Sequence, residues 1–381
     1  MTHRILTVFS GIQSANSQID FVKDYLAYCQ VSMVFNSSDI EQYVIVETNE
    51  KFLPLALSSF GSGAECFTNA NDLINRFISL HQGSDTIVFH QFPSTLLMTC
   101  LGDKTILKKC IWFTWGGDFR RDRYVALRPF RHYLNEKWYK GNFVKRLHGI
   151  ACWNRYDVDL IKYVYRSKAR FYYARYSRGA KSIQGAVWKS KEALSPKRIL
   201  AGNNANPSNN HLLILDILSK FQAEDIEIYM PLSYGSTDTV YREKVIAFGK
   251  EKFGAKFFPL LQYIDHPKYA DFLAGLHVGV FYQHRQQGGY NMAQLLLSGA
   301  KLFLNPSSSP ALHFKDVGIA TFDTKDISRL QFSEFIRLEE SVAQRNADIM
   351  VRERSLELND RRWQSILFRT GSGESASLFS K

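Results

Sequence analysis

The sequence has 381 residues, which is longer than one compact domain usually is, so we expect two domains. Hydrophobic residues make up 45% and charged residues 22%, as in a folded soluble protein, and no apolar run reaches the ~18 residues of a membrane-spanning helix. The net charge of +12 favours an anionic partner, which is a nucleic acid, a lipid surface or a phosphorylated substrate.

The chain opens with "MTHRILTVFSG", which we interpret as a buried first strand. It lacks the long apolar core and the small-residue cleavage site of a signal peptide. The five cysteines are odd in number and widely spaced, without the spacing of a metal site or a disulfide framework. We therefore expect a reducing compartment.

Apolar segments alternate with helical patterns through the first half of the chain. Strands are expected at 4–11, 42–48, 86–92, 108–116 and 148–154, with helices at 17–30 and 70–82. This alternation is typical of a parallel, doubly wound sheet.

A basic and aromatic stretch runs from Arg120 to Arg146, with nine Lys or Arg residues, two acids and six aromatic residues. It suits a membrane interface or stacking on RNA, and it also fits a solvated helix face whose aromatic side chains lie in the core. The candidate contacts for an acceptor or a membrane are Arg120, Arg121, Arg123, Arg128, Arg131 and Trp138.

The alternation restarts in the second half of the chain. Strands are expected at 197–203, 226–232, 255–261, 278–283 and 300–305, with helices at 209–222, 238–253, 266–276 and 292–299. We predict an N-terminal Rossmann-like domain over 1–185, a C-terminal one over 186–335, and a helical segment with a frayed tail over 336–381. The two α/β domains are expected to face a central cleft at the carboxyl ends of their strands.

The loop "HRQQGGYN" lies between a predicted strand and a predicted helix. Its glycines allow close approach of the backbone, and a helix N-terminus carries roughly half a positive charge, to which Arg285 adds a full one. We expect Arg285 and the amides near Gly288 and Gly289 to hold a diphosphate. The side chains expected to orient a ribose or sugar are Gln286, Gln287 and Asn291. The alternative is a plain turn with Arg285 on a surface carboxylate.

Two further loops, "GNNANPSNNH" and "PLSYGSTD", also follow predicted strands of the second domain. Three polar loops at one edge suit the base, ribose and diphosphate of a nucleotide-sugar. The side chains expected to line the rest of this pocket are Asn203, Asn204, Ser233 and Tyr234. For each loop taken alone, a structural turn is the alternative.

In the first domain, "WGGD" ends a predicted strand and places Asp118 at the mouth of the expected cleft. A carboxylate there suits a general base on an acceptor hydroxyl, and a helix cap or an ion pair with a nearby arginine is the alternative. His90 lies at the end of another predicted strand. It either contacts the acceptor or is a structural histidine.

The sequence "DVD" at 157–159 has the Asp-x-Asp form that metal-dependent glycosyltransferases use for a divalent ion. Here it opens a helical stretch, where the helix dipole favours acids. We therefore expect no metal and no cofactor, so arginine and backbone amides must neutralise a leaving diphosphate.

Four segments together resemble glycosyltransferase family 56, the 4-acetamido-4,6-dideoxygalactosyltransferases of enterobacterial common antigen synthesis. They are "WGGD" (115–118), "GNNANPSNNH" (202–211), "MPLSYG" (230–235) and "RQQGGYNMAQLLLSGAKLFLN" (285–305). The resemblance covers roughly residues 85–325 and keeps motif order and spacing. The positions that match the family's motifs are therefore expected to be site residues, with Asp118 as the base and the others on the donor side. They are Asp118, Gly202, Asn203, Asn209, His211, Pro231, Tyr234, Arg285, Gln286, Gln287 and Gly288.

The resemblance implies a GT-B fold and metal-independent transfer by a peripheral enzyme on the cytoplasmic face of the bacterial inner membrane. The implied donor is dTDP-4-acetamido-4,6-dideoxy-D-galactose (dTDP-Fuc4NAc). The implied acceptor is an undecaprenyl-diphosphate-linked disaccharide, lipid II, which becomes lipid III. An anionic membrane surface is an expected partner, and nucleic acid is not.

Three other functions remain open from the residues. One is a GT-B transferase of another nucleotide-sugar, in capsule or lipopolysaccharide repeat synthesis. A second is a sugar-nucleotide epimerase or hydrolase on the same scaffold, which would need no acceptor. A third is a non-catalytic module that binds nucleic acid, with strongly salt-dependent affinity.

Overall fold

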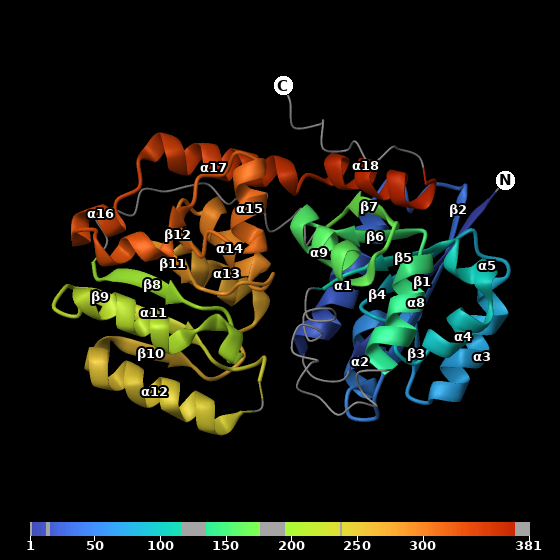
Figure 1. The fold of residues 1–381 in the computed structure, drawn as a ribbon, viewed down its shortest axis with the longest axis horizontal. Coiled ribbons are helices and arrows are strands. Elements are labelled where there is room, and N and C mark those ends of the chain that lie inside the picture. Colours follow the sequence, from blue (N-terminus) through green and yellow to red (C-terminus); the bar gives the residue numbers. More distant parts are fainter. Residues whose placement is uncertain (1, 13–15, 116–134, 176–194, 237, 370–381) are drawn as a thin grey trace. The chain divides into compact units, whose positions relative to one another are not determined.

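The computed structural model describes residues 2–12, 16–115, 135–175, 195–236 and 238–369. The chain divides into two compact units (Figure 1). Unit 1 comprises Met1–Ser182 and Arg354–Lys381, and unit 2 comprises Ile183–Glu353. The C-terminal segment 336–381, which we expected to be a separate part, is therefore divided between the two units.

Unit 1 is built on a seven-stranded parallel sheet in the order β3-β2-β1-β4-β5-β6-β7 (Figure 1). The strands are β1 (His3–Ile12), β2 (Ile40–Thr48), β3 (Glu65–Phe67), β4 (Thr86–His90), β5 (Cys110–Phe113), β6 (Gly149–Cys152) and β7 (Arg170–Tyr173). The central strands are continuous apolar runs, because helices cover both faces of such a sheet.

The described helices of unit 1 are α1 (Asn16–Val31), α2 (Leu53–Phe60), α3 (Ala70–His81), α4 (Leu97–Gly102), α5 (Lys104–Leu107), α8 (Gly141–Arg146), α9 (Arg155–Tyr165) and α18 (Leu356–Leu367). A π-helical turn, Asn135–Lys140, precedes α8. Capping side chains set several starts: Asn69 accepts from the amides of Asn71 and Asp72 at α3.

Two apolar clusters form the core of unit 1. One is centred on Phe89, Trp112 and Phe143, and the other on Phe9, Tyr25 and Trp363. Trp363 belongs to α18, so the last helix completes a core whose other residues come from the first half of the chain.

Asp360 of α18 fastens this helix to the end of α1. Its carboxylate accepts hydrogen bonds from the Tyr28 hydroxyl at 2.6 Å, the Ser32 hydroxyl at 2.6 Å and the Met33 amide at 3.0 Å. Three donors satisfy a buried carboxylate that would otherwise be costly to desolvate.

Unit 2 has a six-stranded parallel sheet in the order β10-β9-β8-β11-β12-β13. Its strands are β8 (Lys197–Ala201), β9 (Ile226–Pro231), β10 (Phe257–Leu260), β11 (Val278–Phe281), β12 (Lys301–Leu304) and β13 (Phe322–Asp323). Its helices are α11 (His211–Leu218), α12 (Thr239–Phe253), α13 (His266–Ala274), α14 (Gly289–Leu297), α15 (Ser309–Asp316), α16 (Phe332–Ile336) and α17 (Glu340–Glu353).

Both sheets reverse their strand order beside their first strand, between β1 and β4 in unit 1 and between β8 and β11 in unit 2. The prediction of two doubly wound parallel sheets is thereby confirmed. In such sheets, ligands bind at the carboxyl ends of the strands where the order reverses. These two switch points are therefore the places to look for a site.

Candidate donor and acceptor sites

The switch point of unit 2 is flanked by the loop 202–210 after β8 and the loop 282–288 after β11. The two strands pair directly, with Val280 beside Ala201, and the Gly202 amide continues the ladder to the Val280 carbonyl at 2.9 Å. Two of the three polar loops predicted to form one site thus start side by side.

Asn203 joins these two loops. Its side-chain oxygen accepts a hydrogen bond from Asn291 Nδ2 of α14 at 3.0 Å, and both side chains are buried. Gly288 has φ +74°, and a Cβ there would lie 3.0 Å from Asn203 Oδ1. The loop before α14 therefore needs glycine at this position, both for its conformation and for the close approach to Asn203.

Ser208 connects the loops a second time. Its hydroxyl accepts from Gln287 Nε2 at 3.0 Å and from Arg285 Nε at 3.3 Å. Gln283, which is buried, donates to the Gln287 carbonyl at 3.1 Å. Arg285, Gln286 and Gln287 are each partly exposed, directly before the N-terminus of α14.

Our predicted set omitted Ser208 and Gln283. Ser208 lies in a loop rich in Asn and Ser that resembles an ordinary turn, and Gln283 ends an apolar segment in the sequence. Their contacts depend on residues about 80 positions away or on the shape of the turn.

Asn209 and His211 shape the first loop from inside. Asn209 accepts from the Asn203 amide and donates to the carbonyls of Asn204 and Asn206, at 2.9 to 3.1 Å. Both side chains have no exposed surface. The structure therefore gives them a supporting role rather than the direct donor contact that we expected.

The His211 ring makes two hydrogen bonds, from Nε2 to the Asn204 carbonyl at 2.8 Å and between Nδ1 and the Tyr241 hydroxyl at 3.1 Å. A carbonyl only accepts, so Nε2 carries the proton and Nδ1 accepts from the tyrosine. Burial lowers the pKa of His211 to about 4, which keeps the ring neutral at physiological pH.

The loop after β9 packs on the first loop. Gly235 has φ +95°, and a Cβ there would lie 2.6 Å from Asn204 Cγ. Asn206 Nδ2 donates to the Gly235 carbonyl at 3.2 Å. The structure thus brings all three predicted loops together, with Ser233 half-buried and Tyr234 38% exposed.

Two further tyrosines adjoin these loops. The rings of Tyr269 in α13 and Tyr290 in α14 stack at 6.4 Å. Burial raises the pKa of Tyr269, with a smaller contribution from the nearby Tyr234. The predicted set did not include Tyr269 or Tyr290, since isolated tyrosines in helical patterns give no signal for a site.

In unit 1, the predicted base Asp118 and the arginines Arg120, Arg121, Arg123, Arg128 and Arg131 lie outside the described residues. The described end of the basic stretch has a mixed character. Trp138 is 65% exposed, whereas Phe143 is buried in the core. Lys140 is buried with its ammonium 4.7 Å from the Phe92 ring centroid, so this cation is used in packing.

His90 lies in the core of unit 1. Its ring has no exposed surface and stacks on Phe9 at 4.1 Å between ring centroids. Burial holds its pKa well below the usual value. Its position does not support the contact with an acceptor that we expected, and corresponds to the structural alternative.

Asp157 and Asp159 belong to the first turns of α9. Asp157 is buried, with its amide bonded to Asn154 Oδ1 at 2.9 Å, and Asp159 pairs with Arg155 at 3.1 Å. The prediction that this motif opens a helix is confirmed. Among the described residues, no group of three or more His, Cys, Asp or Glu side chains is placed to hold a metal ion.

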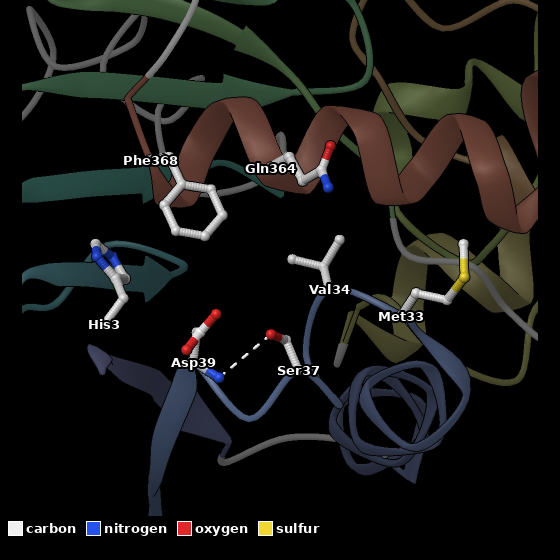
Figure 2. Close-up of a pocket in the computed structure, with 7 residues that line it drawn as sticks. All are labelled: His3, Met33, Val34, Ser37, Asp39, Gln364 and Phe368. Atoms are coloured by element: carbon white, nitrogen blue, oxygen red, sulfur yellow. Dashed lines mark hydrogen bonds between the residues drawn. The ribbon is translucent and has the colours of Figure 1, made fainter. Parts of the chain in front are cut away.

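A cavity of about 370 Å³ occurs at the opposite edge of unit 1, where β1 and β2 begin (Figure 2). It is lined by His3, Met33, Val34, Ser37, Asp39, Gln364 and Phe368. This edge carries the amino ends of the parallel strands, so the cavity is not at a switch point. No helix within the described ranges is long and apolar enough to cross a membrane.

The comparison with protein families gives a match over residues 16–322. The matching family is described as "4-alpha-L-fucosyltransferase glycosyl transferase group 56". The match includes the switch point and all three loops of unit 2, begins after β1 of unit 1, and spans most of the chain.

Solved structures with the same fold include a glycosyltransferase from Rickettsia africae, with 11% identity and a TM-score of 0.63 over 97% of this chain and 100% of that one. HepE from Anabaena, in complex with UDP and glucose, has 10% identity and a TM-score of 0.62 over 97% and 100%. A UDP-forming trehalose-phosphate synthase from Burkholderia xenovorans has 12% identity and a TM-score of 0.60 over 97% and 100%. At these identities the likeness shows the GT-B fold and nothing finer.

Proposed function

The chain belongs to the group 56 glycosyltransferases, and we propose that it transfers 4-acetamido-4,6-dideoxy-D-galactose from its dTDP-linked form to an undecaprenyl-diphosphate-linked disaccharide. In this reaction an acceptor hydroxyl oxygen attacks the anomeric carbon of the donor. The bond from that carbon to the diphosphate oxygen breaks, dTDP leaves, and the hydroxyl proton passes to a base.

The observation that carries the proposal is the set of three loops joined at the unit 2 switch point. Arg285 and the amides at the start of α14 form a positively charged end for the donor diphosphate. The fold neighbour HepE holds UDP, which supports a nucleotide-sugar donor. In the proposal, Gln286 and Gln287 orient the sugar or ribose, and the exposed ring of Tyr234 stacks on the base.

In the same proposal Asp118 is the base and the reaction needs no metal or other cofactor. The basic stretch that ends at Trp138 and α8 docks the enzyme on the anionic cytoplasmic face of the inner membrane. Each Lys or Arg near such a surface contributes about 1 kcal/mol, so several suffice for peripheral binding.

Titration calorimetry with dTDP, UDP and GDP, in magnesium and in EDTA, tests the donor half of the proposal. We expect selective dTDP binding that is indifferent to EDTA, followed by transfer in an assay with the lipid acceptor. Preference for UDP or GDP would overturn the donor, and loss of binding in EDTA would overturn the metal-free reaction. Absence of binding to every nucleotide would overturn the site.

A further inference from the structure

Polar side chains gather at the switch point of unit 1, at the ends of four neighbouring strands. In the register of the sheet, Phe9, His90 and Phe113 lie side by side on β1, β4 and β5. The residues that follow them are Ser10, Gln91 and Thr114. Glu47 lies one residue before the end of β2, which neighbours β1.

The Glu47 carboxylate bridges the end of β1 and the loop after β4, which flank this switch point. Oε2 accepts a hydrogen bond from the amide of Gly11, near the end of β1, at 3.1 Å. Oε1 accepts one from the hydroxyl of Thr95, in the loop after β4, at 2.5 Å. Glu47 is half-buried, and no ion pair of this carboxylate occurs among the described residues. Each carboxylate oxygen has about two acceptor positions, so each keeps one after these contacts.

Gln91 follows β4 and lies near Gly11, in a strained conformation. Its φ is +69°, a left-handed value that is uncommon for a residue other than glycine, and a Cβ on Gly11 would lie 3.5 Å from its side-chain oxygen. Strained backbone is concentrated at functional sites. Gly11 thus connects the two side chains, because its amide donates to Glu47 and its Cα lies near the Gln91 carboxamide, which offers both a donor and acceptors to a ligand hydroxyl.

Two hydroxyls at the same edge have no partner among the described residues. Ser10 is 3% exposed and Thr114 is 1% exposed, and neither oxygen makes a hydrogen bond within the part of the chain that the structure describes. Buried polar groups are usually paired, so two orphans in one row call for an explanation. Neither oxygen has exposed surface, so the two hydroxyls are unsatisfied polar groups at this edge but are not themselves ligand contacts.

From these contacts we propose that Glu47 and Gln91 bind a hydroxyl of the acceptor sugar, with the Glu47 carboxylate as its hydrogen-bond acceptor. The proposal rests on the transferase function above and adds an acceptor-binding position to it. A charge-assisted hydrogen bond to a carboxylate is strong and directional, so this pair selects and orients the acceptor. Donor binding, which we assign to unit 2, does not involve it.

The test uses the full chain, dTDP-Fuc4NAc and a water-soluble short-chain alkyl-diphosphate disaccharide as the acceptor. Glu47→Gln keeps an oxygen for the Gly11 amide but loses the charge, and we expect it to raise the acceptor KM at least 10-fold. The dissociation constant of dTDP, measured by calorimetry, should stay within twofold of wild type. Gln91→Asn tolerates the left-handed φ and shortens the side chain, and we expect the same change in KM.

The matched control is Glu41→Gln, at the other end of the same strand. Glu41 pairs with Arg4 at 2.7 Å near the amino end of β2, so its loss should leave the acceptor KM within twofold. An acceptor analogue that lacks the bound hydroxyl should bind wild type at least 10-fold more weakly than the complete acceptor does. It should bind Glu47→Ala no worse than the complete acceptor does.

The outcomes separate this inference from the proposed function. Transfer by wild type with an acceptor KM within twofold in both Glu47→Gln and Gln91→Asn overturns the inference and leaves the function standing. A wild-type enzyme that binds dTDP but transfers nothing to the lipid acceptor overturns the proposed acceptor, and the inference with it. A raised KM in both variants, with unchanged dTDP affinity and unchanged thermal unfolding, supports the inference.

Discussion

The two switch points share one topology but differ in how their polar groups are satisfied. In unit 2, Asn203, Asn204 and Asn209 bind one another and the neighbouring loops, although Gln283 Oε1 is buried without a partner among the described residues. In unit 1, Glu47 keeps acceptor positions open, and Ser10 and Thr114 lack partners among the described residues. The two edges therefore differ in how far their side chains bind one another, and in our proposal a substrate fills the open acceptor positions of Glu47.

The largest expected effect comes from removing the positive charge of Arg285 at the unit 2 edge. Arg285→Ala should weaken dTDP binding and lower turnover by 100- to 1,000-fold, which corresponds to about 2.7–4 kcal/mol, because it removes a preorganised cation from the leaving diphosphate. Calorimetry and steady-state kinetics measure this. Arg329→Ala, an exposed arginine of the same unit, is the control. Unchanged dTDP affinity in Arg285→Ala would remove this residue from the site.

The second effect is a dependence of the unfolding free energy on pH, caused by the buried His211 in unit 2. His211 has a folded pKa of about 4 against ~6.5 when unfolded, so below pH ~6.5 the unfolded state binds more protons. The stability contribution of the neutral ring is complete above pH ~6.5 and is lost as the pH falls to about 4, by roughly 3 kcal/mol.

Urea unfolding at several pH values measures this loss. The difference in unfolding free energy between wild type and His211→Gln should shrink as the pH falls through this window. A difference that is constant with pH would contradict the structural role of His211.

A third effect tests the packing between the loops of unit 2. Gly235→Ala should destabilise by about 2–3 kcal/mol, because its Cβ would overlap the Asn204 side chain and its φ is +95°. Gly254 has φ +54° with no atom within 4 Å, so Gly254→Ala carries the backbone strain alone and should cost about 1 kcal/mol. Equal losses in denaturant unfolding would show that the contact with Asn204 is not tight.

The smallest effect concerns the strain in unit 1. Gln91→Gly should stabilise the fold by about 0.5–1 kcal/mol, because glycine adopts φ +69° freely, while it raises the acceptor KM. Arg166→Gly, at φ +50° in the C-cap of α9, should give a similar gain in thermal unfolding with an unchanged KM. A loss of stability in Gln91→Gly would mean that the side chain contributes more than the strain costs.

The sequence predicts the framework well where the physical signal is local. Apolar runs identify β1, β4, β8 and β11, and helical periodicity with a capping residue identifies α3 and α12. The edge strands β3, β7 and β13 escaped prediction, because they have only two to four residues and lack a long apolar run.

The candidate sites were predictable only in part. Glycine-rich loops after strands indicate the unit 2 site, but the inward position of Asn209 and His211 follows from packing that one sequence does not show. Glu47 and Gln91 were missed because no motif surrounds them. Their meaning comes from the bridging contacts of one carboxylate and from a backbone angle.

Because helix α18 lies at the end of the chain but belongs to unit 1, it determines which unit can fold completely first. All of unit 2 lies between Ile183 and Glu353, whereas unit 1 needs Trp363 and Asp360 from the last thirty residues for its core and for the clasp on α1. A ribosome therefore delivers every residue of unit 2 before unit 1 can be finished, although unit 1 emerges first. The apolar face that α18 covers in unit 1 therefore lacks its cover while the second sheet is being made.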